Sequence, residues 1–351
     1  MNYTVFGESH GNAIGVTITG LPAGLVLDLD ALNFDMNRRA TGKNQLSTAR
    51  KEADEIEFLS GVFEGKTTGT PLTLIIRNTD QHSKDYSQLK ILPRPSHADY
   101  SGSVRYNGCN DYRGGGHFSG RLTAPLVAAG AIAKQILAQR NVFVGAHIAS
   151  IAGIADTPLD SVADQRNLLA EVAAKDFPVL DDRAGQAMQQ AILRAREEQD
   201  SVGGLIQCAV YGLPVGMGSP DLDENVEGIF ARHLFAVPAV KGLEFGAGFA
   251  LAGMRGSQAN DPFYLDGDTI RTRTNHSGGV NGGITNGMPV LFNVAMRPTP
   301  SIAQEQDTVN LVTGENAKLS IHGRHDPCIV HRAVPVIEAA AALAACQLLF
   351  L

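Results

Sequence analysis

The segment D-Y-R-G-G-G-H-F-S-G-R at Asp111–Arg121 runs directly into the apolar stretch Thr123–Gln139. That stretch is apolar almost all round, which predicts a buried helix. Three consecutive glycines, a hydroxyl group and an arginine at the entry of this helix predict an anion cradle, since backbone N–H groups and the helix dipole would face the ligand. The alternative is a glycine-rich connector with a helix cap, but the charged and titratable side chains around it favour a functional site.

Strand and helix signals alternate irregularly outward from this segment. We expect strands at residues 13–19, 71–77, 203–212 and 290–296, and helices at residues 28–39 and 123–139, with two more between 161 and 200. No linker and no internal repeat interrupts them. The pattern predicts one compact α+β domain over residues 1–351, with helices covering the sheet faces.

Composition narrows the ligand class. The chain has 351 residues and a net charge of −7, which argues against a nucleic-acid surface. The basic residues are nonetheless clustered, which favours a small anionic ligand over a polymer. Those in the segments rich in His and Gly are Arg38, Arg39, Lys43, Arg50, Arg94, Arg105, Arg113 and Arg121.

The sequence also predicts a cytoplasmic protein without a membrane partner. Its four cysteines are widely spaced and form no C-x-x-C motif, so we expect reduced thiols rather than a disulfide framework. No signal peptide precedes the first motif at Gly7. The apolar run Ala333–Leu351 carries Glu338 and Gln347 and barely reaches the roughly 20 residues of a membrane span, so a buried core helix is the favoured interpretation.

Titratable side chains gather in three glycine-containing motifs. His10 lies in G-E-S-H-G at 7–11, His97 in R-P-S-H-A-D at 94–99, and Asp326 in G-R-H-D-P-C at 323–328. Histidine suits proton transfer near neutral pH. The structural alternatives are a turn with a hydrogen-bonded histidine and a helix N-cap at Asp326. The segment Met296–Ser301 either contacts an anion or only turns the chain.

Several common sites are absent from the sequence. No H-E-x-x-H pair supports a catalytic metal, and we predict none. Neither a G-x-x-x-x-G-K-[ST] loop nor a G-x-S-x-G elbow occurs.

At these motifs the sequence resembles the chorismate synthase family. The nine matching motifs occur in the family's order and cover essentially the whole chain. They are F-G-E-S-H-G at 6–11, N-T-D-Q at 78–81, R-P-S-H-A-D at 94–99, D-Y-R-G-G-G at 111–116, D-S-V-G-G at 200–204, V-K-G-L-E-F-G at 240–246, R-G-S-Q at 255–258, N-H-S-G-G at 275–279 and G-R-H-D-P-C at 323–328.

The resemblance implies a fold, a reaction and a cofactor. The family adopts a β-α-β-α sandwich and forms homotetramers. It converts 5-enolpyruvylshikimate 3-phosphate to chorismate and phosphate by an anti-1,4-elimination, the last step of the shikimate pathway. It requires reduced FMN (FMNH2), although the reaction has no net redox change. Whether NADPH reduces the flavin is left open.

The resemblance also assigns roles to residues. His10 would protonate the departing phosphate and His97 the reduced flavin, although these two roles could be exchanged. Asp326 would assist proton removal near flavin N5, and Ser9 and Ser119 would support the proton network. The substrate-binding cations would be Arg39, Arg121 and Arg324, and the flavin contacts would come from Ser119, Gly282, Arg297, Pro298, Thr299, Ser301 and Arg324.

Several positions depart from the family pattern. R-R-R-P-G is replaced by Arg38-Arg-Ala-Thr-Gly42, so Ala40 stands where a cation is usual, and Gln45 replaces another arginine. Lys43 could replace one of these charges. His117 and Pro238 are further departures, and they affect the expected flavin contacts more than the expected reaction.

Two other functions are compatible with an anion site. A flavin oxidoreductase would share the phosphate-binding needs, but no G-x-G-x-x-G opens a strand–helix unit with an acid about 20 residues further on. A non-catalytic anion-binding module would leave the two histidines and Asp326 without a purpose.

Overall fold

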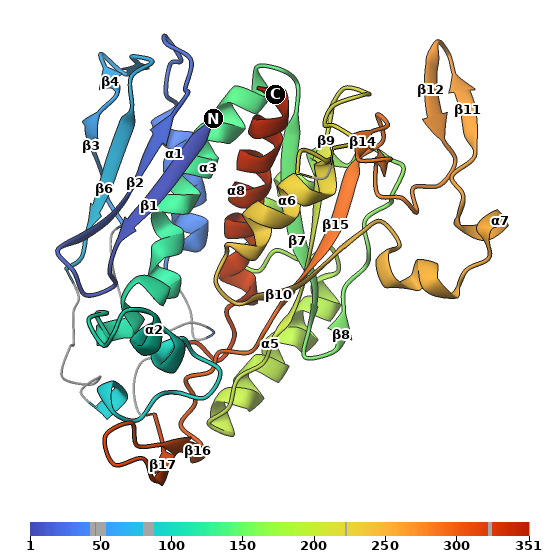
Figure 1. Cartoon of the computed structure of the whole chain (residues 1–351). Coiled ribbons are helices and arrows are strands. Elements are labelled where there is room, and N and C mark those ends of the chain that lie inside the picture. The colour runs from blue at the N-terminus through green and yellow to red at the C-terminus, as the bar shows by residue number, and fades with distance from the viewer. Residues whose placement is uncertain (43–45, 47–53, 80–87, 222, 322–324, 351) are drawn as a thin grey trace.

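The computed structural model describes residues 1–42, 46, 54–79, 88–221, 223–321 and 325–350. These residues form four layers in the order sheet, helices, sheet, helices (Figure 1). The prediction of an α+β fold, and the β-α-β-α sandwich that the family resemblance implied, are both confirmed.

The first layer is a four-stranded antiparallel sheet with the order β1-β2-β6-β3. Its strands are β1 (Asn2–Gly7), β2 (Ala13–Thr19), β6 (Leu72–Arg77) and β3 (Ile56–Ser60). Alternate residues of β2 point to opposite faces, so Ile14, Val16 and Ile18 are fully buried on the helix side.

The second sheet has five strands in the order β10-β15-β9-β7-β8, and every neighbouring pair is antiparallel. Its strands are β10 (Val240–Phe245), β15 (Val290–Met296), β9 (Gly204–Tyr211), β7 (Phe143–Ile151) and β8 (Ile154–Ala155). Both faces of its central strands are covered, so β9 is buried along nearly its whole length.

Helices fill the space between the sheets and cover the far face of the second one. The inner helices are α1 (Leu29–Arg39), α3 (Thr123–Ala138), α6 (Val226–Phe235) and α8 (Val330–Leu349). The outer helices are α4 (Arg166–Ala173) and α5 (Asp182–Glu197), which pack on β7 and β8. In α5 the predicted apolar face is buried at Met188, Ile192 and Ala195.

The remaining elements are short and mostly connect the layers. Four hairpins are β4 (Val62–Phe63) with β5 (Lys66–Thr67), β11 (Phe263–Asp266) with β12 (Thr269–Thr272), β13 (Val280–Asn281) with β14 (Ile284–Thr285), and β16 (Gln306–Val309) with β17 (Asn316–Leu319). The short helices are α2 (Asp99–Arg105), η2 (Arg113–Phe118), η3 (Gly120–Leu122), η4 (Gly248–Gly253) and α7 (Gly256–Ala259). The β11–β12 hairpin projects away from the layers (Figure 1).

Helices α3 and α8 form the centre of the core and run in the same direction (Figure 1). Gly130 of α3 lies so close to α8 that a Cβ atom there would sit 2.2 Å from the Cβ of Ala339. Although α8 is long and apolar enough for a membrane span, 83% of its most apolar 18-residue window is buried inside the protein. The predicted core helix is therefore confirmed.

A cluster of four charged side chains is buried where α1, α3 and α8 meet. Glu338 is 1% exposed and accepts hydrogen bonds from Arg38 (2.6 and 2.8 Å) and from Lys134 Nζ (2.6 Å). Asp35 accepts from the same two cations, at 3.0 and 2.8 Å. Burial opposes the charge on Glu338, but Arg38 and Lys134 outweigh it and hold the pKa of this carboxyl below its ordinary value. The four formal charges cancel, which lets them remain in the core.

We predict that Glu338→Gln lowers the free energy of unfolding by about 3–5 kcal/mol at pH 7, since it leaves buried cations without their carboxylate. The ion-pair contribution of Glu338 is present above the ordinary carboxyl pKa and is lost as the pH falls through the lowered folded value. Urea unfolding of both proteins at pH 7 and in acid measures this. Glu57→Gln is the control, because Glu57 pairs with Arg77 on the surface and its loss should cost at most about 1 kcal/mol. Equal costs in the two variants would contradict the prediction.

Candidate active site

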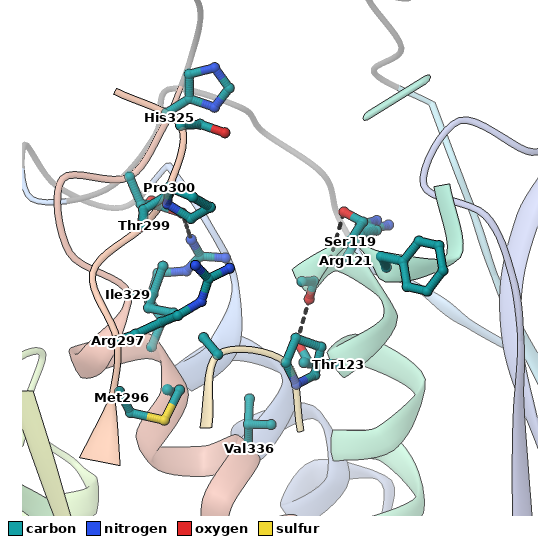
Figure 2. A pocket seen from close by; sticks show the side chains of 18 of the residues that line it. Ser119, Arg121, Thr123, Met296, Arg297, Thr299, Pro300, His325, Ile329 and Val336 are labelled. Carbon is teal, nitrogen blue, oxygen red and sulfur yellow. Dashed lines mark hydrogen bonds and ion pairs between the residues drawn. The ribbon is translucent and has the colours of Figure 1, made fainter. Parts of the chain in front are cut away.

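A cavity of about 270 Å³ lies at the end of the inner helix layer where α3 and α8 begin. Ser119, Arg121 and Thr123 form one wall, and residues 296–301 after β15 form the facing wall (Figure 2). Ile329 and Val336 of the α8 region add an apolar surface between them. Segments from six parts of the sequence, which also include residues 39–41, 94–97 and 237–239, therefore meet around one space.

The glycine triplet 114–116 brings the two histidine motifs together. All three glycines have positive φ angles of 60°, 83° and 55°, a conformation that glycine adopts without strain. A Cβ atom on Gly114 would lie 2.5 Å from the ring of His10, and one on Gly115 would lie 3.3 Å from the ring of His97. Glycine is required here because the loop backbone packs directly against both imidazoles.

Two hydrogen bonds fasten the first motif to this loop. The backbone N–H of Ser9 donates to the carbonyl of Gly116 at 3.1 Å, and Nδ1 of His117 donates to the carbonyl of Gly7 at 2.9 Å. The departure from the family pattern at His117 therefore has a structural role in this chain.

Asp99 orients His97 and Arg94. Its Oδ1 lies 2.7 Å from Nδ1 of His97, while its two oxygens accept from Arg94 Nε at 2.7 Å and Nη2 at 2.8 Å. Nδ1 also lies 3.1 Å from Arg94 Nη2, which can only donate, but the contact with the carboxylate is shorter and favours the imidazole proton on Nδ1, which leaves Nε2 beside the glycine loop. Burial opposes the charge on Asp99, but the hydrogen bonds from Arg94 and His97 outweigh it and hold its pKa well below its usual range.

Asp54 joins two buried arginines of the cavity. One oxygen accepts from Arg39 Nη1 at 3.0 Å and the other from Arg121 Nη1. Arg39 also donates to the hydroxyl of Thr123 at 3.1 Å, and Arg121 Nε donates to Asn78 at 3.2 Å. Burial lowers the pKa of Arg39 to about 10, despite Asp54, so the side chain stays a cation at neutral pH. The shared carboxylate thus fixes both guanidinium groups at the wall.

Asp326 forms an ion pair with Arg332 and is not the N-cap residue of α8. Arg332 Nη1 donates to Oδ2 of Asp326 at 2.6 Å, and its Nε donates to the carbonyl of Arg39 at 3.1 Å. The N-cap position of α8 is Ile329, so the N-cap alternative for Asp326 was wrong. His325 beside it is largely buried, and burial together with the nearby Arg94 lowers its pKa to about 4.

The charges of the cavity favour an anion. Among the described residues, five arginines and one carboxylate line it: Arg39, Arg94, Arg121, Arg297, Arg332 and Asp326. Helices α3 and α8 both begin here, and neither N-cap residue makes a side-chain cap hydrogen bond. Their positive dipole ends therefore add to the arginines. No cluster of His, Cys, Asp and Glu suited to a metal occurs among the residues that the structure describes.

Most of the residues singled out from the sequence converge on this cavity. Those lining it are Arg39, His97, Ser119, Arg121, Arg297, Thr299, Ser301 and Asp326. Ser9 and His10 lie behind Gly114, at 0% and 4% exposure. Pro298 adjoins the wall without lining the cavity, and Gly282 lies in the β13–β14 hairpin and does not line it. Arg324, Lys43 and Gln45 lie outside the described residues.

The positions around Arg39 refine the sequence interpretation. Arg38 faces Glu338 in the core, so Arg39 is the residue of this pair that lines the cavity. Ala40 is the C-cap of α1, and Pro238 is part of the cavity wall. Four side chains received no role from the sequence: Asp54, Asp99, His325 and Arg332. Only Asp99 and His325 lay inside quoted motifs, so only they could have been inferred there.

We predict that Asp99→Asn destabilises the protein by about 1.5–3 kcal/mol at pH 7, the usual worth of hydrogen bonds to a charged group. Because the folded pKa of Asp99 is lowered, this stabilisation is present above about pH 4 and lost as the pH falls further. Urea unfolding at pH 7 and pH 3 measures it. Asp307→Asn, which changes an exposed partner of Lys318, should have little effect, and an equal effect would refute the assignment.

The chain is similar along nearly its whole length to proteins of one known family. A family model described as chorismate synthase matches residues 1–350. Chorismate synthases of Dehalococcoides mccartyi and Thermococcus kodakarensis are 45% and 44% identical over 96% and 97% of this chain and 91% and 94% of theirs. That of Synechocystis is 45% identical over 98% of this chain and 94% of its own. A crystal structure of a chorismate synthase superposes with a TM-score of 0.77 at 28% identity, covering 99% of this chain and 91% of that one. The chain belongs to the chorismate synthase family.

Proposed function

We propose that this enzyme eliminates phosphate from 5-enolpyruvylshikimate 3-phosphate in an anti-1,4 sense, with reduced FMN bound beside the substrate, to give chorismate. The observation that carries the proposal is the convergence of Arg39, Arg121, His97 and Asp326 on one cavity at two helix N-termini. A substrate with one phosphate and two carboxylates matches this excess of positive charge.

Substrate binding would depend on arginines that are held before the substrate arrives. Arg39 and Arg121 share Asp54, so their guanidinium groups need little reordering to meet anionic oxygens. Preorganisation of this kind lowers the entropy cost of binding. Asp54 also reduces the cost of burying two like charges while the cavity holds no anion.

Proton transfers would be divided between separate groups of the site. His10 lies against Gly114, and the adjacent Ser9 has a fully buried hydroxyl with no hydrogen-bond partner among the described residues. These two would serve the departing phosphate. His97, with Nδ1 held by Asp99, would present Nε2 toward the flavin, and Asp326 would assist proton removal. The two histidine roles could be exchanged.

The wall at residues 296–301 suits a flavin. Thr299 Oγ1 is buried without a partner among the described residues, and Arg297 and Ser301 lie beside it. Met296, Ile329 and Val336 give an apolar surface for a planar ring, while Ser119 faces them across the cavity (Figure 2). Reduced flavin held at this wall would supply electron density to the elimination, without net redox change. Contacts from Gly282, Pro298 and Arg324 stay predictions, as does NADPH as the reductant.

The same proposal covers the organisation of the protein. Residues 1–351 would form one domain, which is supported by a hydrophobic core shared between both sheets. The enzyme would act in the cytoplasm as a homotetramer, without nucleic-acid or membrane partners. Four exposed apolar side chains are candidates for subunit contacts. They are Phe249 of η4 and Phe263, Leu265 and Ile270 of the projecting β11–β12 hairpin.

We predict that the purified protein with pre-reduced FMN releases phosphate from 5-enolpyruvylshikimate 3-phosphate under anaerobic conditions, without net flavin oxidation. His10→Ala and Asp326→Ala should each lower turnover by about 100-fold or more, as is usual for loss of a proton-transfer group. Phosphate release and flavin absorbance are the measurements. Stoichiometric consumption of NAD(P)H would favour the oxidoreductase alternative instead. Binding without any phosphate release would favour an anion-binding module.

We predict that Gly114→Ala lowers turnover about 100-fold, since its Cβ would displace the His10 ring from a distance of 2.5 Å. Gly24→Ala is a matched control: Gly24 also has a positive φ angle, of 83°, but no atom lies within 4 Å of its added Cβ. Each variant should lose about 1–3 kcal/mol of its free energy of unfolding, because an alanine is strained at a positive φ angle. Turnover and urea unfolding separate the two effects, and equal turnover in both variants would remove His10 from the site.

A further inference from the structure

A second cavity of about 160 Å³ lies where the ends of α1 and α4 meet the first turns of α8. Arg332 lines both cavities, so the start of α8 is the wall between them. None of the residues to which the proposed reaction assigns a role lines this second space. Its walls therefore need a separate explanation.

His331 is the most unusual residue of the second cavity. It is only 6% exposed, and neither ring nitrogen has a hydrogen-bond partner among the residues that the structure describes. Its ring stacks against Phe177, with centroids 6.0 Å apart. Burial and the neighbouring Arg332 lower its pKa to about 4, so the imidazole is neutral at pH 7. One N–H donor and one acceptor are thus buried without partners among the described residues, which is unfavourable unless a bound molecule satisfies them.

The charged residues of this cavity favour an anion. Arg38, Lys175 and Arg332 line it against a single carboxylate, Asp176. Each cation is already tethered on one side: Arg38 by Glu338, Lys175 by Asp182 at 2.8 Å, and Arg332 by Asp326. These contacts hold the cations in place without closing the cavity. The uncapped start of α8 adds its positive dipole end.

The rest of the lining is apolar. Phe34, Pro178 and Pro335 contribute flat surfaces, and Ala173 and Ala174 leave room at the end of α4. Pro335 has no N–H, so the carbonyl of His331 lacks the helical hydrogen bond that residue 335 would otherwise donate. A ligand here would meet cations, unsatisfied polar groups of His331 and apolar walls. Inorganic phosphate would meet the cations and the N–H of His331 but would leave the apolar walls unused.

We propose that the second cavity is a binding site for a small carboxylate with a planar apolar body. The carboxylate lies among Arg38, Lys175 and Arg332, the N–H of His331 gains an acceptor, and the apolar body packs on the proline and alanine surfaces. Arg332 contacts Asp326 and the backbone of Arg39, so this ligand lies one side chain away from the proposed active site.

Benzoate is a suitable probe, titrated calorimetrically into the protein in the absence of flavin and substrate. We expect saturable binding of one benzoate per chain. Benzamide, which has the same shape without the charge, should bind at least tenfold more weakly, and inorganic phosphate, which the larger cavity would bind, should not compete with benzoate over the same concentration range. No saturable binding of benzoate, or equal affinities for benzoate and benzamide, would overturn the proposal. This readout is independent of turnover, so it stands apart from any failure of the proposed reaction.

Substitutions in each cavity test which of the two binds benzoate. Ala174→Gln fills the second cavity from its exposed rim and should weaken benzoate binding at least tenfold, as should His331→Phe in the wall. Ala170→Gln, exposed on the same helix and outside the cavity, is the matched control and should bind normally. Arg297 lines the larger cavity and not the second one, so Arg297→Gln should also leave the affinity for benzoate unchanged. Loss of binding in Arg297→Gln but not in Ala174→Gln would assign benzoate to the larger cavity and overturn the proposal.

Discussion

The close approach of α3 and α8 at Gly130 and Ala339 is the constraint on which the rest of the structure depends. A side chain at position 130 would overlap α8, so only glycine lets the two helices lie side by side at full length. Because they run in the same direction, both N-termini open on the same end of the core. Two sheets then cover the pair from either side, and the loops at that end become the walls of the larger cavity.

Buried charge is balanced by acids that come from both near and distant parts of the chain. Glu338 balances Arg38 and Lys134 in the core, Asp54 lies between Arg39 and Arg121, and Asp99 supports Arg94 and His97. An arginine alone in such surroundings would be costly to bury, whereas a paired one keeps both its charge and its direction. The cavity can therefore remain positively charged toward a ligand while each arginine is held from behind.

Sequence reasoning predicted helices α1, α3, α4, α5 and α8 and strands β2, β6, β9 and β15, since their apolar patterns are continuous, but it did not predict the inner helix α6. It did not predict β7, because His147 and Ser150 interrupt the apolar run. In the structure, His147 is buried between Asp156 at 3.0 Å and Gln207 at 3.1 Å. Strand β1 was missed because it runs directly into the first glycine motif. These polar interruptions are explained only by partners that sequence periodicity does not reveal.

Site residues could be predicted where reactive side chains lie together in a sequence motif. Residues whose role depends on contacts between distant segments of the fold could not. His97, Arg121 and Asp326 stood out by their neighbours in sequence. Asp54 lies in an unremarked polar segment, and its role exists only because Arg39 and Arg121 approach it from two helices. Arg332 lies just before the apolar run Ala333–Leu351, and its role became visible only through its contact with Asp326.

The central position of α8 has a consequence for the way the protein is made. Residues before Val330 emerge from the ribosome first, yet the space between their two sheets stays open until α8 arrives. Glu338 alone bonds across 300 residues to Arg38 and across 204 to Lys134. Until α8 arrives, the nascent chain therefore carries exposed apolar sheet faces and two cations that have only Asp35 as a partner, a state that favours aggregation. The two sheets would therefore complete their packing only late in folding, once α8 has been synthesised.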